Sequence, residues 1–279
     1  MQHIKLPVAS AIEPTILRVL SYNVQVGIST TRPHHYLTGS WKHLFPHSKR
    51  LINLDQIIPL VSSYDLVGLQ EVDAGSLRSN FINLTEYLAE GSGFPYWYHQ
   101  VNRNLGKMAQ HSNGLLSRFR PNYVENIKLP GLIPGRQAIM ANYGPRNNQI
   151  AVFVLHMALS KRARLKQFDY MSDLINEHPH AIVMGDLNCR YDSKEMQLLF
   201  KRTNLHEPLN DAHTFPSWQP QHSIDHILVT TDLNVKNIDV VGEAQSDHLP
   251  ISMEIELPDS VKLEPLEHEP LSSKQFFNV

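Results

Sequence analysis

The chain has 279 residues, with 25 lysines and arginines against 27 aspartates and glutamates, and a net charge of -2. Its single cysteine excludes an internal disulfide framework and a cysteine-rich zinc module, and its 42% apolar content argues against intrinsic disorder. The near-neutral charge argues against a protein that wraps nucleic acid, although a local basic groove remains compatible with it.

Strand-like apolar runs alternate with amphipathic helices in the first part of the chain. Residues 16–24 and 65–70 are predicted to be strands. Apolar residues at helical spacing predict helices over 49–61 and 77–88, the first ending near Pro59 and the second stopped by Gly91. Residues 31–48 form an irregular insertion, which we expect to be a substrate lid, a membrane-surface contact or an ordered loop.

The rest of the chain is richer in strands. Turn residues separate four predicted strands, and a helix, a strand and a second helix capped by Asp192 follow them. Three more strands complete the series. In chain order the predicted elements are strands at 94–101, 114–117, 138–143 and 150–156, a helix at 162–177, a strand at 181–185, and strands at 224–230, 235–241 and 251–257.

This order of elements predicts an α/β fold in which two sheets pack together and helices cover their outer faces. We expect an N-terminal extension over 1–15, a single catalytic domain over 16–258 and a flexible tail over 259–279. No apolar run is long enough for a signal peptide or a membrane span. A monomeric cytoplasmic protein is therefore expected, with peripheral membrane contact as the alternative.

Polar residues recur where the predicted strands begin or end. Their carboxylate and amide oxygens are hard ligands, which suit Mg²⁺ or Mn²⁺ rather than zinc. A remaining carboxylate can hold a water molecule, and a histidine backed by an aspartate can bind a phosphate. Together these residues predict metal-assisted hydrolysis of a phosphate ester. They are Asn23, Gln70, Glu71, His156, Asp186, Asn188, Asp225, Asp247 and His248.

Seven segments, in this order, resemble the endonuclease/exonuclease/phosphatase superfamily of deoxyribonuclease I-like proteins. The resemblance runs from about residue 17 to 257 and implies a four-layered α/β sandwich with two mostly antiparallel sheets flanked by helices. The segments are LSYNVQ around Asn23, GLQEVD at 68–73, NGLLSRF at 113–119, LHMALS at 155–160, GDLN at 185–188, SIDHILV at 223–229 and SDHLP at 246–250.

The resemblance also implies a metal shell. Glu71 would be the main ligand of Mg²⁺ or Mn²⁺, and Asn23 and Asp247 would complete the shell directly or through water. Whether one or two metal ions bind stays open.

Five further residues are implied to be catalytic. Asp186 would position or deprotonate the attacking water, and Asn188 would orient it. His248 would contact the scissile phosphate, with Asp225 hydrogen-bonded behind it. His156 would be a second histidine on the phosphate side.

Candidate substrate contacts come from two segments. Asn113 and Arg118 fall in a segment that resembles the substrate-side strand of the family, although Arg118 is equally suited to a structural ion pair. The basic run at 161–166 could line a phosphate-bearing substrate or form a solvated helical turn; its candidates are Lys161, Arg162 and Arg164. Cys189 is interpreted as a small buried thiol and His226 as a structural residue.

The expected substrate is a phosphate ester, either nucleic acid or a lipid or inositol-phosphate headgroup. A phosphodiesterase, nuclease-like or acting on a phospholipid headgroup, is the preferred prediction. The alternative is an inositol-phosphate phosphomonoesterase, because GDLNCR at 185–190 resembles a motif of the inositol polyphosphate phosphatases. A catalytically inactive binding protein is disfavoured, since every motif residue is present.

Overall fold

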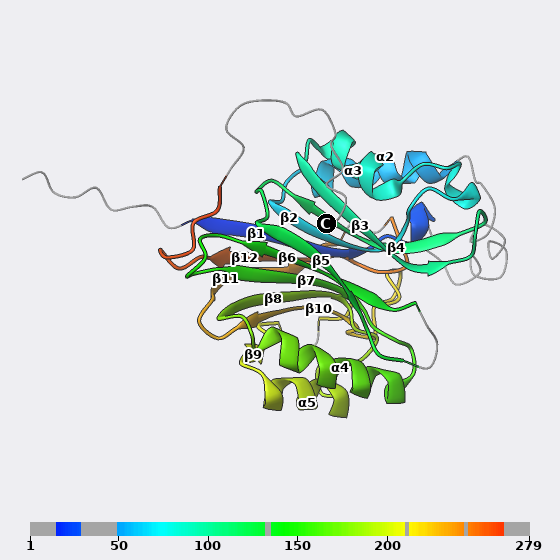
Figure 1. Ribbon diagram of the computed structural model, residues 1–279. Helices are drawn as coiled ribbons and strands as arrows, with labels where there is room; N and C mark the ends of the chain where they lie inside the picture. The colour runs from blue at the N-terminus through cyan, green and yellow to red at the C-terminus, as the bar shows by residue number, and fades with distance from the viewer. Residues whose placement is uncertain (1–14, 29–48, 132–134, 210–211, 243–244, 265–279) are drawn as a thin grey trace, which may run out of the picture.

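The computed structural model describes residues 15–28, 49–131, 135–209, 212–242 and 245–264. Two six-stranded sheets pack face to face, and helices cover the outer face of each, which confirms the expected four-layered α/β sandwich (Figure 1). The insertion at 31–48 and most of both terminal segments lie outside the described residues, so the predictions made for them are not addressed.

The first sheet has the order β11-β12-β1-β2-β4-β3 and the second has the order β5-β6-β7-β8-β10-β9. Each contains one parallel pair, β1 with β2 and β7 with β8, and every other pair is antiparallel. The strands are β1 (Ile16–Asn23), β2 (Leu66–Asp73), β3 (Tyr96–Asn104), β4 (Gln110–Ser117), β5 (Tyr123–Lys128), β6 (Gln137–Tyr143), β7 (Ile150–His156), β8 (His180–Asp186), β9 (Leu205–His206), β10 (Asp225–Thr230), β11 (Asn234–Val240) and β12 (Ile251–Glu256).

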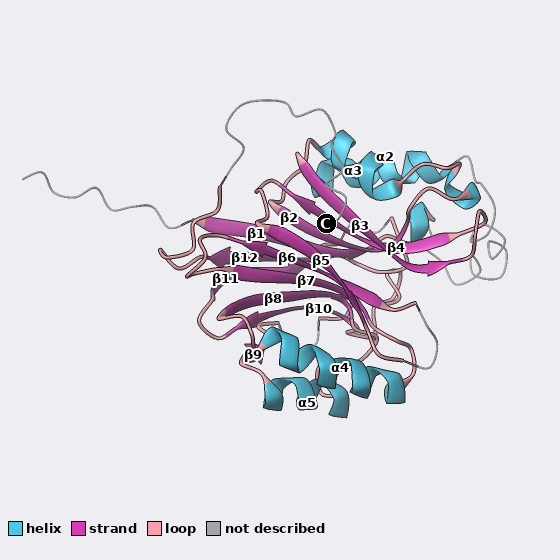
Figure 2. Cartoon of the chain, in the orientation of Figure 1, coloured by secondary structure: helices cyan, strands magenta, loops and turns pink. Residues whose placement is uncertain are grey.

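Helices α2 (Lys49–Val61) and α3 (Leu84–Ser92) cover the first sheet, and α4 (Lys161–Ile175) and α5 (Lys194–Arg202) cover the second (Figure 2). Three apolar cores follow from this arrangement. One fills the space between the sheets, and the other two fill the spaces between each sheet and its helices. The central strands β7 and β8 are buried on both faces, which explains their long apolar runs. No helix in the described part of the chain has the length and apolar content needed to cross a membrane.

The helix expected over 77–88 is wrong at both ends. A 3-10 turn, η3 (Leu77–Ser79), comes first, and the left-handed residues Asn80 and Phe81 separate it from α3. Asn83 begins α3, because its side chain accepts hydrogen bonds from the amides of residues 85 and 86. Gly91 lies inside the helix, which ends at the left-handed Gly93.

Smaller differences concern a cap and two strands. Ser193, not Asp192, caps α5, since its hydroxyl accepts from the amide of Met196. The edge strands β5 and β9 were not expected. β5 is mostly exposed and β9 has two residues, so neither has a periodic apolar pattern long enough to detect.

Candidate active site

Both parallel pairs end at the same edge of the molecule. In the first sheet Asn23 pairs with Gln70, and in the second His156 pairs with Asp186. The antiparallel β10 begins at this edge too, because Asp225 lies opposite Asp186. A hydrogen bond of 3.2 Å from Asn23 Nδ2 to Asp186 Oδ2 then joins the two sheets. The packing therefore brings together strand ends that are far apart in sequence.

Glu71 reaches this edge through an irregularity in β2. The pairing of β2 with β4 shifts register between Leu69 and Val72, and Glu71 has a φ of 54°. A left-handed conformation at a non-glycine residue costs roughly 1–3 kcal/mol, and such bulges commonly re-aim side chains beside active sites. The Glu71 side chain is 32% exposed and lines a cavity, unlike the fully buried Gln70 before it.

The turn after β8 fixes the position of Asp186. Its Oδ1 accepts from the amide of Asn188 at 2.9 Å, and Asn188 Nδ2 donates to the carbonyl of Met157 at 3.0 Å. Asn188 has a left-handed φ of 54°. Only glycine fits at position 185, where φ is 141° and a Cβ atom would lie 2.0 Å from the carbonyl oxygen of Leu155. The segment GDLN thus forms a tight turn whose side chains are held by the backbone.

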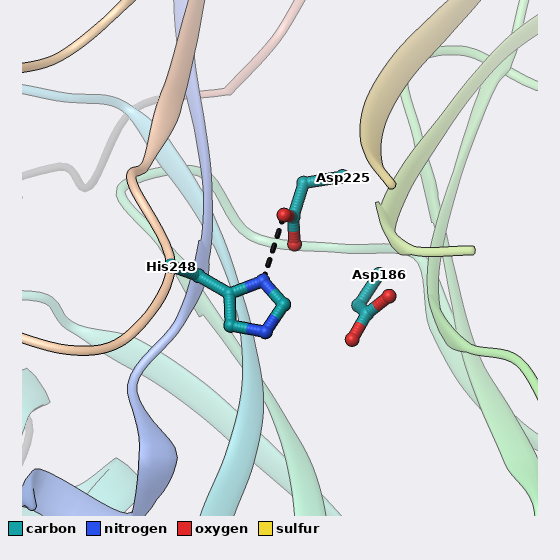
Figure 3. Close-up of side chains that lie close together, drawn as sticks. All are labelled: Asp186, Asp225 and His248. Carbon is teal, nitrogen blue, oxygen red and sulfur yellow. Dashed lines mark hydrogen bonds and ion pairs between the residues drawn. The ribbon is translucent and has the colours of Figure 1, made fainter. Parts of the chain in front are cut away.

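His248 and Asp225 form a buried pair. His248 Nδ1 lies 2.8 Å from Asp225 Oδ2, and Thr214 Oγ1 donates to the same oxygen at 2.5 Å (Figure 3). Burial alone would lower the pKa of His248, but the charges of Asp225, Asp186 and Asp247 raise it to about 10. The His248 ring is therefore protonated. Asp225 contacts its Nδ1 atom and not its Nε2 atom.

The carboxylates around this pair are crowded. Burial and the nearby Asp225 raise the pKa of Asp186 to about 7. Burial and the charge of Asp247 also raise the pKa of Glu71. His156 offers little compensation: its Nε2 lies 3.5 Å from Asp186 Oδ2, yet burial and cationic neighbours lower its pKa well below the usual value. The cluster has more negative charge than its neighbours neutralise, which suits a cation.

Ligand atoms of Asp186, Asp225 and His248 lie within 4.8 Å of one another and could hold a metal ion. The imidazolium state of His248 and its bond to Asp225 make it a poor ligand, because a metal needs the neutral imidazole. The oxygen donors at this edge fit a hard cation better.

Gln25 belongs to this site and was not predicted from the sequence. Its Nε2 donates to Asp247 Oδ2 at 3.0 Å, and its amide donates to Asn23 Oδ1 at 3.2 Å. Gln25 follows β1 in a left-handed conformation (φ 45°) that turns its side chain back to the site. The position of Asn23 could have indicated Gln25, because a polar residue two positions after a strand end can face the same edge of the sheet.

Asn113 is fully buried and bonds to Asn102, which lines a cavity, and to Gln137, which does not. It accepts from Asn102 Nδ2 at 2.9 Å and donates to the carbonyl of Gln137 at 3.1 Å. Gln137 opens β6 in the other sheet, so these bonds tie the sheets together. Asn102 lines the cavity and Asn113 does not.

Arg118 does not join the site, which corrects its expected substrate role. It follows the end of β4 that pairs with the start of β2, at the opposite edge from Glu71. Its guanidinium donates to the carbonyls of Ser62 (2.6 Å) and Tyr64 (2.9 Å) beyond α2 and lies 4.6 Å from the Phe94 ring centre. Arg118 therefore secures the C-terminal end of a helix.

The cations at the start of α4 have different surroundings. Arg164 is buried and bonds to Glu195 Oε1 at 2.8 Å, and Lys161 Nζ lies 3.7 Å from Glu195 Oε2. Both therefore join α4 to α5, and neither lines the cavity described below. Arg162 lies in the wall of the cavity.

That cavity has a volume of about 530 Å³ and opens beside Glu71 and His156. Arg136, a second residue missed from the sequence, lines it with Arg103 and Arg162. Burial lowers the pKa of Arg136 while the charges of Asp186 and Glu71 oppose this shift. Antiparallel pairing of β6 with β7 brings the start of β6 beside the end of β7, and this places Arg136, just before β6, near His156.

Two residues beside the site are structural. His226 faces away from Asp225, as strand alternation predicts, and its ring nitrogens contact Glu207 Oε1 at 2.6 Å and the carbonyl of Cys189 at 2.8 Å. Burial raises the pKa of the Cys189 thiol to about 11, which disfavours the thiolate form that a nucleophile needs.

A model of the Endonuclease/Exonuclease/phosphatase family matches residues 20–248. No curated protein matches the sequence. Among solved structures, an endonuclease/exonuclease/phosphatase from Beutenbergia cavernae is 18% identical with a TM-score of 0.67, over 88% of this chain and 72% of that chain.

Two further structures share the fold. A mannosyl-6-phosphatase of Bacteroides thetaiotaomicron is 17% identical with a TM-score of 0.64, over 86% of this chain and 99% of that chain. The human Nocturnin catalytic domain with bound sulfate is 17% identical with a TM-score of 0.61, over 86% and 94%.

Proposed function

The chain belongs to the endonuclease/exonuclease/phosphatase family, and from that premise and the geometry above we propose that it is a Mg²⁺- or Mn²⁺-dependent phosphodiesterase. The observation that carries the proposal is the convergence of two carboxylates of raised pKa, Glu71 and Asp186, with the imidazolium of His248 at one edge of two sheets. A base, a cation site and a fixed positive charge then stand together, as hydrolysis of a phosphate ester requires.

Glu71, Asn23 and Asp247 would hold the metal ion. Their donors are carboxylate and amide oxygens, and the unneutralised charge around them supports this placement. When bound, the ion would stabilise charge that develops on the phosphate oxygens. Gln25 would keep the Asp247 carboxylate oriented through its bond to Oδ2.

Asp186 would accept a proton from the attacking water. Its pKa of about 7 lies near neutral pH, where a general base is most effective. The amide of Asn188 holds Oδ1, and Asn23 holds Oδ2, so the carboxylate is fixed in orientation. The Asn188 side chain would stabilise the turn by donating a hydrogen bond to the carbonyl of Met157.

His248 and Arg136 would bind the scissile phosphate. The imidazolium is held by Asp225 and needs no rearrangement to stabilise negative charge as the water attacks. Arg136 provides a guanidinium that lines the cavity beside Glu71. His156, whose lowered pKa keeps it neutral, would donate or accept a hydrogen bond at the same phosphate.

A phosphomonoesterase is the second candidate. The observation that favours it is the number of cationic groups at the site, since His248 and Arg136 suit the dianion of a monoester. The mannosyl-6-phosphatase among the similar structures is named for such an activity.

The test is an assay of one purified preparation with added Mg²⁺ on bis(4-nitrophenyl) phosphate, 4-nitrophenyl phosphate, plasmid DNA, sphingomyelin and inositol phosphates. We expect hydrolysis that EDTA abolishes, with the diester preferred over the monoester. Asp186→Asn should lower kcat by about 10³-fold, because the base is lost while the shape of the side chain is retained.

Asp239→Asn is the matched control, since Asp239 is exposed on the edge strand β11 and the substitution is chemically the same. It should keep full activity. Equal activity of Asp186→Asn and Asp239→Asn would reject the assignment of Asp186, and absence of metal-dependent hydrolysis on every ester would reject the function.

A further inference from the structure

The cavity is lined by residues of several elements besides those that carry the proposed catalytic residues. Glu71 and His156 lie in its wall, and α4 contributes Arg162 and Lys166. Strands β3 and β4 contribute Arg103 and His111. The cavity is therefore walled by elements of both halves of the molecule, with cationic side chains on each side.

The charge of this wall differs from that of the chain. The lining residues include four cations, Arg103, Arg136, Arg162 and Lys166, and one carboxylate, Glu71. The whole chain carries a net charge of -2. Cations gathered in a concave space attract an anionic group more strongly than cations spread over a surface.

These four cations differ from most other cations of the described residues, although the charges of Asp186 and Glu71 act on Arg136. Within the described residues, none of their charged groups forms a hydrogen bond or an ion pair. The neighbouring cations on the same helix differ, because Lys161 and Arg164 both contact Glu195. The sequence of α4 thus places one set of cations against a structural carboxylate and leaves the other facing the cavity.

The pKa of His111, which also lines the cavity, is lowered in part by these cations. Burial and the charge of Arg78 lower the pKa of His111 to about 4, and Arg103 and Arg136 add to this effect. The histidine is therefore neutral, and it can donate a hydrogen bond to an anion without adding charge.

We propose that this cavity binds a second phosphate group, so that the substrate is a small molecule with at least two phosphates, one hydrolysed and the other held by Arg103, Arg162 and Lys166. This inference rests on the proposed phosphoesterase function. Guanidinium groups bind phosphate through paired hydrogen bonds, and three cations can match the charge of a phosphate dianion.

Size and lining favour a small carrier for these phosphates. The volume of about 530 Å³ lies within the range of small-molecule sites, roughly 300–1,000 Å³. Ala158, Leu159 and Ala163 supply an apolar wall against which a ring can pack. A choline headgroup is disfavoured, because its quaternary ammonium would face unpaired cations.

The experiment compares one phosphate with two on the same carrier. The probes are adenosine 5′-monophosphate against adenosine 3′,5′-bisphosphate, and myo-inositol 1-phosphate against myo-inositol 1,4-bisphosphate. Calorimetric binding to Asp186→Asn with Mg²⁺ is measured, because binding of these phosphates does not depend on whether the enzyme hydrolyses monoesters or diesters. We expect the second phosphate to tighten binding by about 30-fold on at least one carrier.

The double variant Arg162→Ala/Lys166→Ala should reduce that ratio to less than threefold. Both side chains are exposed, so the fold should be retained, and thermal unfolding checks this. The control Arg146→Ala removes an exposed arginine from the turn between β6 and β7, at the opposite end of the sheet, and should leave the ratio unchanged.

Two results would overturn the inference. One is a second phosphate that changes affinity by less than threefold on both carriers, or whose effect survives the double variant. The other is an oligonucleotide that binds Asp186→Asn at least tenfold more tightly than every bisphosphate. The proposed function has a separate test, the loss of nitrophenyl ester hydrolysis in Asp186→Asn, so failure of one is distinguishable from failure of the other.

Discussion

Two buried aspartates at the ends of central strands, Asp73 in the first sheet and Asp186 in the second, have opposite surroundings. Asp73 accepts hydrogen bonds from the Ser76 amide (2.6 Å) and hydroxyl (2.8 Å) and from the Ser79 hydroxyl (2.8 Å), and it pairs with the buried Arg78. Burial alone would raise the pKa of Asp73, but the Ser76 amide and Arg78 lower it to about 2.

Asp186 has fewer donors and more carboxylates around it. It accepts from Asn23 and Asn188, while burial and Asp225 raise its pKa to about 7. The difference teaches that burial of a carboxylate does not identify its role. Donors in excess indicate a structural anchor, whereas a shortage of donors beside other carboxylates indicates a group arranged for a proton or a cation.

The largest expected effect on folding comes from Asp73→Asn. The variant keeps the side-chain shape but leaves the guanidinium of Arg78 buried without its counter-charge, which should lower the free energy of unfolding by about 3 kcal/mol. Urea unfolding measures this. Asp239→Asn is the control and should change it by less than about 0.5 kcal/mol. A loss below about 1 kcal/mol for Asp73→Asn would contradict the anchoring role.

Acid should remove the contribution of Asp73 in a defined window. Because its folded pKa (about 2) lies below the unfolded value (about 3.9), the stabilisation is present above the unfolded pKa and is lost as the pH falls toward 2. The loss should amount to about 2.5 kcal/mol. Urea unfolding between pH 5 and 2 should show it in the wild type, and a curve of the same shape in Asp73→Asn would argue against this source.

Mg²⁺ should stabilise the folded protein by binding beside Asp186, and it should not bind beside Asp73. At a free concentration tenfold above Kd, the free energy of unfolding should rise by about 1.4 kcal/mol. Glu71→Gln should abolish the rise, and Glu177→Gln, at an exposed position just beyond α4, should keep it. Unfolding at constant ionic strength is the measurement, and an equal rise in both variants would place the cation elsewhere.

The smallest expected effect is a gain. Without metal, Asp186→Asn removes a carboxylate whose ionised form burial and Asp225 disfavour, so the protein should become more stable by roughly 1 kcal/mol at neutral pH. Urea unfolding in EDTA tests this. Destabilisation comparable to that of Asp73→Asn would mean that Asp186, like Asp73, is a structural anchor.

Most of the fold was predictable from the sequence because buried strands and amphipathic helices have distinct apolar periods. The helix at 49–61 and the strand at 150–156 have the predicted bounds. Irregular backbone was harder to predict: the left-handed Asn80 and Phe81, which delay α3, carry no periodic signal.

The polar residues at strand ends were also recognisable, because the chemistry of a carboxylate, an amide or a histidine depends on its own atoms and on its place at the end of an apolar run. The sequence by itself therefore identified the family and the fold, and it named candidate residues at strand ends. Asn23, Glu71 and Asp186 needed no coordinates to be named as candidates.

Only the tertiary structure decided which cations line the cavity beside the candidate site. Arg118 and Arg136 look alike in sequence, yet one secures a helix end and the other lines the cavity. Arg162 and Arg164 are two residues apart on one helix, and Glu195 of another helix separates their roles. The physical reason is that the energy of a charge depends on its neighbours in space, and the tertiary packing of sheets and helices fixes those neighbours.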